Sequence, residues 1–75
     1  MNKDEFNIAL NLLGFQFNGT GVWSHELMIV SYNHPQGAFI EVLLNTGKKY
    51  TYNHAYFGYK TVYNRVMYSL KSLGD

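Results

Sequence analysis

The stretch AFIEVLLNTGKKYTY, residues 38–52, decides how this 75-residue chain folds. Residues 38–44 have the two-residue period of a β-strand, in which successive side chains point to opposite faces. Asn45, Thr46 and Gly47 predict a tight hairpin loop, and residues 48–52 then form the next strand. We expect the first strand to turn Ile40, Val42 and Leu44 toward the core and Phe39, Glu41 and Leu43 to the opposite face.

A further strand is predicted before this hairpin. Residues 22–32 are rich in β-branched and aromatic residues, which favour extended structure. We expect one strand with Trp23, His25, Leu27 and Ile29 on one face and Ser24, Glu26, Met28, Val30 and Tyr32 on the other. Residues 33–37 contain Pro35 and Gly37 and predict a turn into the hairpin. The strands together predict a three-stranded antiparallel meander.

Apolar side chains at helical spacing occur in the sequence both before and after the meander. Residues 3–13 predict a first helix, which Asn2 can cap and Gly14 can end. The period of a helix returns from Tyr59 and continues to Gly74. The apolar stripes are Phe6, Ala9, Leu10 and Leu13 in the first helix and Tyr59, Val62, Tyr63, Val66, Leu70 and Leu73 in the second.

This order predicts an α+β fold in a single small domain, residues 1–75, with the pattern α-β-β-β-α. The economical packing places both helices against one face of the three-stranded sheet. The other face of the sheet then meets solvent or a partner, as is common for antiparallel sheets.

Composition and motifs exclude several kinds of site. The chain has no cysteine, which suits a reducing compartment, and no apolar run approaches the roughly 20 residues that cross a bilayer. We therefore expect a cytoplasmic protein without membrane contact. The three histidines, His25, His34 and His54, lack a metal-ligand spacing, and no glycine-rich phosphate loop leads into a helix. No metal and no cofactor are predicted.

Charge and tyrosine content divide the chain into unlike halves. Residues 42–74 hold five basic side chains, no acidic one and six of the seven tyrosines, whereas residues 1–41 hold four acidic side chains against one basic. Basic residues interleaved with aromatic ones are typical of a nucleic-acid surface, but they also occur where tyrosines fill a core beside ordinary lysines.

Two candidate binding surfaces follow from these patterns. Tyr50 and Tyr52 share one face of the last strand. If that face is open, their rings can stack on bases while Lys48 and Lys49 meet phosphates. The alternative is that both rings pack inward beneath the last helix. The second surface consists of the apolar residues Trp23, Phe39 and Leu43, which an open sheet face would offer to a protein partner or to a second copy in a homodimer.

A family resemblance adds a catalytic alternative. The segments Leu13-Gly14-Phe15, Ser24-His25, His34-Pro35-Gln36-Gly37 and residues 61–70 resemble the small HicA messenger-RNA-cleaving toxins, whose fold is like that of double-stranded RNA-binding domains. The resemblance implies that His25 is a general base that removes the proton of a ribose 2′ hydroxyl.

The sequence as a whole favours a small non-catalytic module that binds a macromolecule through the open sheet face and the Tyr/Lys edge. A protein partner is expected first, with the module acting as a regulator or inhibitor of the kind that phages and mobile elements encode. The alternatives are a HicA-like ribonuclease using His25 and a nucleic-acid-binding module without cleavage.

Overall fold

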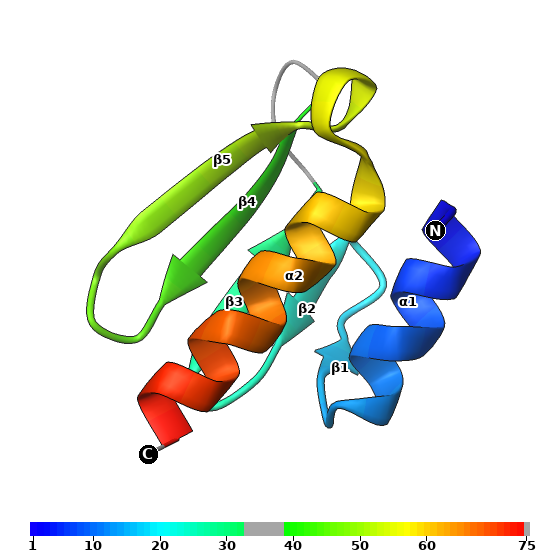
Figure 1. Ribbon diagram of the computed structural model, residues 1–75. Helices are drawn as coiled ribbons and strands as arrows, with labels where there is room; N and C mark the ends of the chain where they lie inside the picture. The colour runs from blue at the N-terminus through cyan, green and yellow to red at the C-terminus, as the bar shows by residue number, and fades with distance from the viewer. Residues whose placement is uncertain (33–38, 75) are drawn as a thin grey trace.

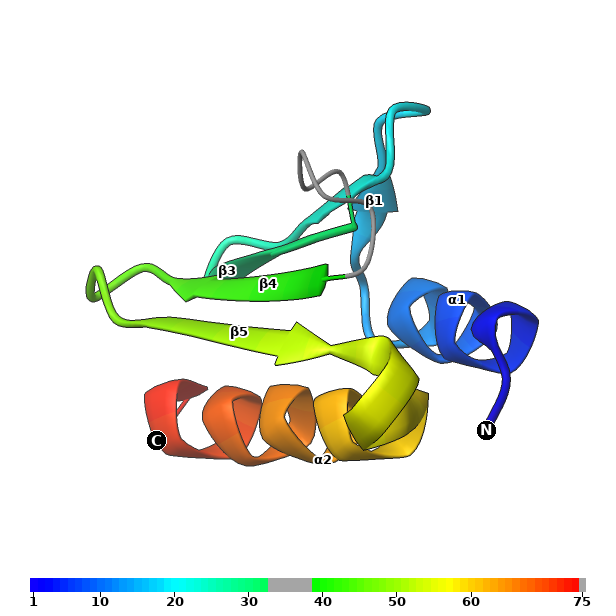
Figure 2. The same ribbon diagram turned by 90° about the horizontal axis from the view of Figure 1, so that it is seen from above.

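Two helices cover one face of a five-stranded antiparallel sheet (Figures 1 and 2), which confirms the α+β class and the order helix, strands, helix. The computed structural model describes residues 1–32 and 39–74, with His54 described by its backbone alone. The strands lie in chain order across the sheet, so that β1 and β5 form its two edges. The elements are α1 (Lys3–Leu12), β1 (Gln16–Phe17), β2 (Val22–Ser24), β3 (Met28–Ser31), β4 (Phe39–Leu44), β5 (Lys49–Asn53) and α2 (His54–Gly74).

The prediction of a single strand over residues 22–32 is wrong, because the chain reverses after His25. His25 and Met28 exchange two backbone hydrogen bonds, with N···O distances of 2.9 and 3.3 Å, which leaves only Glu26 and Leu27 in the turn. The His25 ring supports this turn, since its Nδ1 accepts a hydrogen bond from the Leu27 amide at 3.1 Å. The turn contains no glycine, proline or asparagine, the residues by which hairpins are read from a sequence.

This reversal also changes which side chains share a face. Trp23 pairs with Val30 across β2 and β3, so both point toward the helices, and Ser24 pairs with Ile29 on the outer face. The expected grouping of Trp23 with Ile29 is therefore wrong. A two-residue strand, β1, adds a fifth strand by pairing Phe17 with Trp23. The turn predicted over residues 33–37 lies outside the described residues.

The core lies between the sheet and the helices. Ile40, Val42 and Leu44 face it as predicted, and Phe39, Glu41 and Leu43 lie half-buried on the outer face. The buried cluster consists of Phe6, Leu10, Phe15, Trp23, Met28, Val30, Ile40, Val42, Leu44, Val62 and Val66. Burial of these side chains is the main source of stability in so small a domain.

Both ends of α1 follow the prediction. Asn2 Oδ1 accepts from the Glu5 amide at 2.8 Å and Glu5 Oε1 accepts from the Asn2 amide at 2.9 Å, which is a reciprocal capping box. After the helix, Gly14 has a φ of +94°, a conformation that glycine adopts without steric cost. The hydroxyl of Tyr32, which follows β3, donates a hydrogen bond to the side chain of Asn7 in α1. Burial of this hydroxyl raises the pKa of Tyr32 above the usual range for tyrosine.

Gly58 interrupts α2 near its start. Its φ of 72° and ψ of 166° are not helical, so residues 54–57 form a single helical turn after β5, and the long part of the helix follows Gly58. This region of backbone conformation is open essentially to glycine alone. The break lets the chain leave the edge of the sheet and return across its inner face (Figure 1).

Core packing predicts a sharp contrast between two leucines of α1. Leu10 is fully buried whereas Leu12 is 81% exposed. We expect Leu10→Ala to lower the free energy of unfolding by about 2–5 kcal/mol through lost burial and a cavity, and Leu12→Ala to change it by less than about 0.5 kcal/mol. Urea denaturation followed by circular dichroism measures both; equal losses would contradict the packing.

Backbone strain predicts the effect of changing Gly58. A Cβ at this position would meet nothing within 4 Å, so the cost of Gly58→Ala is the cost of its backbone conformation, about 1–3 kcal/mol of unfolding free energy. Gly74, near the end of the same helix, has open space and no positive φ, and Gly74→Ala serves as the matched control. Thermal and urea denaturation that leave Gly58→Ala as stable as its control would show that the break is not there.

Candidate functional site

Two binding residues predicted from the sequence, Tyr50 and Tyr52, lie on the inner face of β5. Tyr50 pairs with Val42 and Tyr52 pairs with Ile40, and both partners are core residues of β4. The two tyrosines therefore point toward α2 and are half-buried, which is the inward-packed alternative of the two open from the sequence. Because β5 is an edge strand, their outer rims reach the surface beside the helix.

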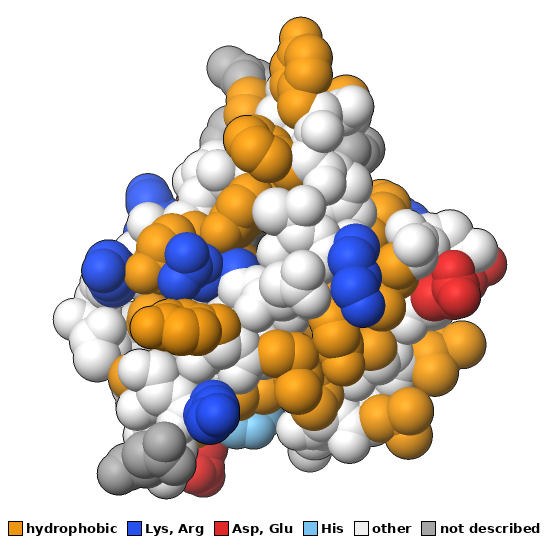
Figure 3. Space-filling model, in the orientation of Figure 1, with side chains coloured by type: hydrophobic (Ala, Val, Ile, Leu, Met, Phe, Trp, Pro, Cys, Tyr) orange, Lys and Arg blue, Asp and Glu red, His pale blue; other side chains and the backbone are white. Residues whose placement is uncertain are grey.

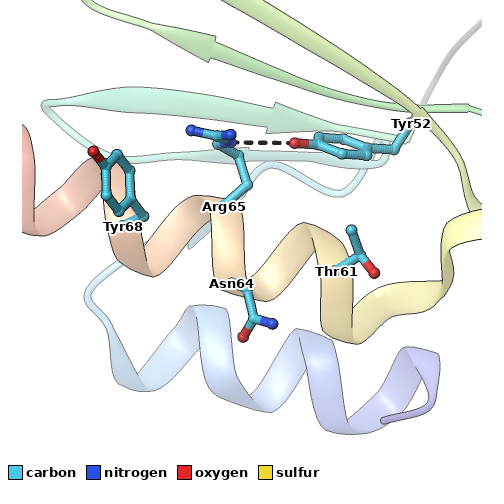
Figure 4. A pocket seen from close by; sticks show the side chains of 5 residues that line it. All are labelled: Tyr52, Thr61, Asn64, Arg65 and Tyr68. Carbon is cyan, nitrogen blue, oxygen red and sulfur yellow. Dashed lines mark hydrogen bonds between the residues drawn. The ribbon is translucent and has the colours of Figure 1, made fainter.

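Arg65 of α2 lies against these rings. Its Nε donates a hydrogen bond to the Tyr52 hydroxyl at 3.2 Å, and its guanidinium carbon is 4.2 Å from the centroid of the Tyr50 ring and 5.5 Å from that of Tyr68. Figure 4 shows Arg65 reaching from α2 toward Tyr52. A cation over an aromatic face is held electrostatically, and the hydrogen bond to Tyr52 raises the pKa of Arg65. The guanidinium is thus oriented by three tyrosines.

No carboxylate neutralises this cation in residues 1–32 and 39–74, where the one ion pair joins Lys49 to Glu41 at 3.9 Å. The terminal nitrogens of Arg65 donate no hydrogen bond to a residue within the same ranges. The planar fork of arginine donors matches the geometry of carboxylate and phosphate oxygens. Arg65 therefore offers an oriented and unpaired set of donors.

Two hollows flank Arg65 and Tyr68 along the helix. The larger, of about 480 Å³, is lined by Tyr52, Thr61, Asn64, Arg65 and Tyr68. The smaller, of about 290 Å³, shares Arg65 and Tyr68 and adds, among others, Thr46, Lys48, Tyr50 and Ser72. In Figure 3, lysine and arginine side chains gather over β5 and the adjoining part of α2. We call the two hollows and the residues that line them the Arg65 groove.

The two lysines predicted as binding residues, Lys48 and Lys49, point to opposite sides of the sheet. Lys48 lines the smaller hollow, with its Nζ 5.6 Å from the centroid of the Tyr50 ring. Lys49 is on the outer face, where it pairs with Glu41 and its side chain stays 57% exposed. The structure therefore brings Lys48, Tyr50 and Tyr52 together and leaves Lys49 out.

The predicted apolar surface is only partly present. Trp23 is 6% exposed and belongs to the core, so its expected place on an open face is wrong; the hairpin turn after His25 turns it inward. Phe39 and Leu43 are half-buried on the outer face, and Ile29, the cross-strand partner of Leu43, is 41% exposed. Because the Glu41–Lys49 pair lies on the same face, this surface is mixed in polarity.

The family resemblance implied His25 as an alternative, catalytic site. A hollow of about 300 Å³ is lined by Gly14, Gln16, Ser24, His25 and Glu26. Because His25 Nδ1 accepts the Leu27 amide, the neutral ring carries its proton on Nε2 and presents a donor there. A general base needs the opposite arrangement. The Glu26 carboxylate beside it would repel a phosphate, and none of the described residues lining this hollow is a cation.

Four residues that line the larger hollow were not singled out as a site from the sequence: Thr61, Asn64, Arg65 and Tyr68. Their spacing of i, i+3, i+4 and i+7 places them on one face of a helix, and this is the signal by which they could have been found. Two exposed apolar side chains on α1 were also not singled out from the sequence: Ile8 is 60% exposed and Leu12 is 81% exposed.

Three kinds of comparison found no relative from which a function could be transferred. No protein-family model matches the chain, and the curated proteins and the solved structures gave no significant match. Among the described residues, no helix is long and apolar enough to cross a membrane, and no three histidine, cysteine or acidic side chains are grouped as metal ligands would be.

Proposed function

We propose that the chain is a non-catalytic module that binds single-stranded nucleic acid in the Arg65 groove. The observation that carries this proposal is the guanidinium of Arg65, which three tyrosines hold in place beside two surface hollows and which no acidic side chain of the described residues neutralises.

The charge of the groove favours a phosphate-bearing ligand. Arg65 offers terminal N–H donors, and Lys48 adds a second cation in the smaller hollow. Phosphate oxygens accept several hydrogen bonds at once and so match an arginine fork. From Val42 to Gly74 the sequence contains no acidic residue, so nothing on β5 or in this part of α2 would repel a polyanion.

The exposed rings favour single-stranded nucleic acid over an acidic peptide. Tyr68 is 67% exposed although it also contacts Arg65, so much of its ring remains open to stacking. Tyr56 and Phe57, in the turn before Gly58, are 84% and 53% exposed. Bases stack on such rings, each for about 1–3 kcal/mol. An acidic peptide would use the cations but has no comparable use for open aromatic faces.

The proposal predicts salt-dependent binding of single-stranded oligonucleotides. Fluorescence anisotropy with labelled 12-mers should show an affinity that falls as salt rises, because phosphate contacts release counterions. Lys48→Ala should reduce the slope of log affinity against log salt by about 0.7. Lys49→Ala removes the same charge from the outer face and is the matched control, for which we expect a smaller change.

Two outcomes would contradict this function. If no oligonucleotide binds at low salt, the proposed function is wrong. If Lys48→Ala and Lys49→Ala have equal effects, the phosphate contact does not lie in the groove. Gel analysis of an RNA ligand after incubation tests the ribonuclease alternative in the same samples. We expect intact RNA, because His25 presents a donor rather than a base in its present geometry.

A protein partner on the outer sheet face is the second candidate, as expected from the sequence. The observation that favours it is Ile29, 41% exposed and directly opposite Leu43 across the β3–β4 pair. Exposed apolar side chains on a sheet face can contribute to an association surface, and a second copy of the chain is the occupant that we test.

Sedimentation velocity at increasing protein concentration tests this second candidate. If the outer face forms a homodimer, Ile29→Lys should shift the dimer to monomer. Leu12→Lys places the same charge on α1, away from the sheet, and should leave the dimer intact. A chain that stays monomeric at all concentrations, or a dimer that only Leu12→Lys disrupts, would remove the outer face as the site of self-association.

A further inference from the structure

We infer that Phe57 is a second stacking platform at the end of the Arg65 groove, so that one strand of nucleic acid runs from Tyr68, past Arg65, to Phe57. This inference rests on the proposed function and deepens it, because it assigns the path and the minimum length of the ligand. The exposed ring of Phe57 then takes a base of the same strand whose phosphate Arg65 holds.

Tyr52 joins the Phe57 ring to the groove. The two ring centroids are 5.7 Å apart in an edge-to-face contact with an interplanar angle of 85°, and the Tyr52 hydroxyl accepts the hydrogen bond from Arg65 Nε at 3.2 Å. The guanidinium carbon of Arg65 in turn lies 5.5 Å from the centroid of the Tyr68 ring. These contacts form one row from Phe57 to Tyr68. Figure 4 shows Arg65 between Tyr52 and Tyr68 in this row.

The Phe57 ring is held in place and is still open to a ligand. An edge-to-face contact between aromatic rings contributes about 0.5–1.5 kcal/mol beyond the area that it buries, so the contact with Tyr52 favours one position of the ring. Phe57 is nevertheless 53% exposed. A side chain that is already positioned loses less entropy when a ligand binds it, and an open ring of this kind is what a base stacks on.

The turn that carries Phe57 lies on the same face of the molecule as the cations of the groove. Gly58 separates this turn from the long part of α2. In Figure 3, hydrophobic side chains extend from the turn, at the top of the view, down to the lysine and arginine side chains over β5. Residues 42–74 contain no acidic side chain, so this part of the chain does not repel a polyanionic strand that follows the row.

The spacing of the two rings sets the length of strand that reaches both. Residues 59–68 of the helix lie between Gly58 and the Tyr68 side chain, which is about 15 Å along the axis at about 1.5 Å per residue. A stacked strand rises by about 3.4 Å per nucleotide, so about four or five nucleotides cover this distance, and fewer when the strand is extended. A dinucleotide bound at Arg65 and Tyr68 is too short to reach Phe57.

Binding of single-stranded oligo-deoxythymidylates of two lengths by the full chain tests this inference. Phe57→Ala should weaken binding of the octanucleotide by about tenfold through lost stacking. The same variant should leave the affinity for the dinucleotide, followed by nuclear magnetic resonance titration, unchanged. Phe57→Trp keeps a flat ring at the position and should keep the affinity for the octanucleotide.

Phe17 provides a matched control for the loss of an exposed ring. It is 50% exposed and contacts Trp23 at a centroid distance of 4.9 Å, much as Phe57 contacts Tyr52. It lies on β1, at the opposite edge of the sheet from β5. Phe17→Ala should therefore leave the affinity for both oligonucleotides unchanged.

The outcomes separate this inference from the proposed function. If Phe57→Ala weakens the dinucleotide and the octanucleotide equally, Phe57 acts only by supporting Tyr52, and the second platform is wrong. If Phe57→Ala changes neither affinity, or if Phe57→Trp or Phe17→Ala loses as much as Phe57→Ala, the platform is also wrong and the binding module stands. If no oligonucleotide binds, both fail.

Discussion

α2 packs across the inner face of β4 and β5, and this contact sets both the core of the domain and the geometry of the groove. Val62 and Val66 are fully buried in the same core as Ile40 and Val42. Once this contact is made, the alternation of β5 turns Tyr50 and Tyr52 toward the helix, and the helical period places Arg65 beside their rings. The same burial that stabilises the domain therefore assembles the groove from an edge strand and the flank of a helix.

The groove holds the Arg65 cation without an acidic partner among the described residues. Arg65 is partly removed from water, and in the described residues it has aromatic faces and one hydroxyl as partners in place of a carboxylate. Aromatic contacts of this kind contribute about 0.5–2 kcal/mol. They fix the direction of the guanidinium and leave its terminal N–H groups without a hydrogen-bond partner among the described residues.

The sequence predicted the parts that follow from regular periodicity and missed those set by local contacts. The α1 cap, the β4–β5 hairpin and the α2 stripe were predictable, because each repeats a residue pattern tied to backbone geometry. The turn after His25 was not, because a backbone bond pair and an imidazole hold it without glycine or proline. The same holds for the candidate site. The basic, aromatic run predicted Lys48, Tyr50 and Tyr52. That Trp23 and Lys49 lie away from the groove depends on which face of the sheet each side chain takes, and that Arg65 lies in it depends on how α2 packs against β5.

A nuclear magnetic resonance titration with single-stranded oligonucleotide can follow Arg65 itself, because its Nε–Hε group has its own signal in a ¹⁵N-correlated spectrum. If the groove binds the oligonucleotide, we expect this signal and the backbone amides of β5 and residues 61–72 to shift together and saturate together, while amides of α1 and of Ile29 and Leu43 stay in place. Shifts confined to α1 or to the outer sheet face, with the Arg65 signal unchanged, would contradict it.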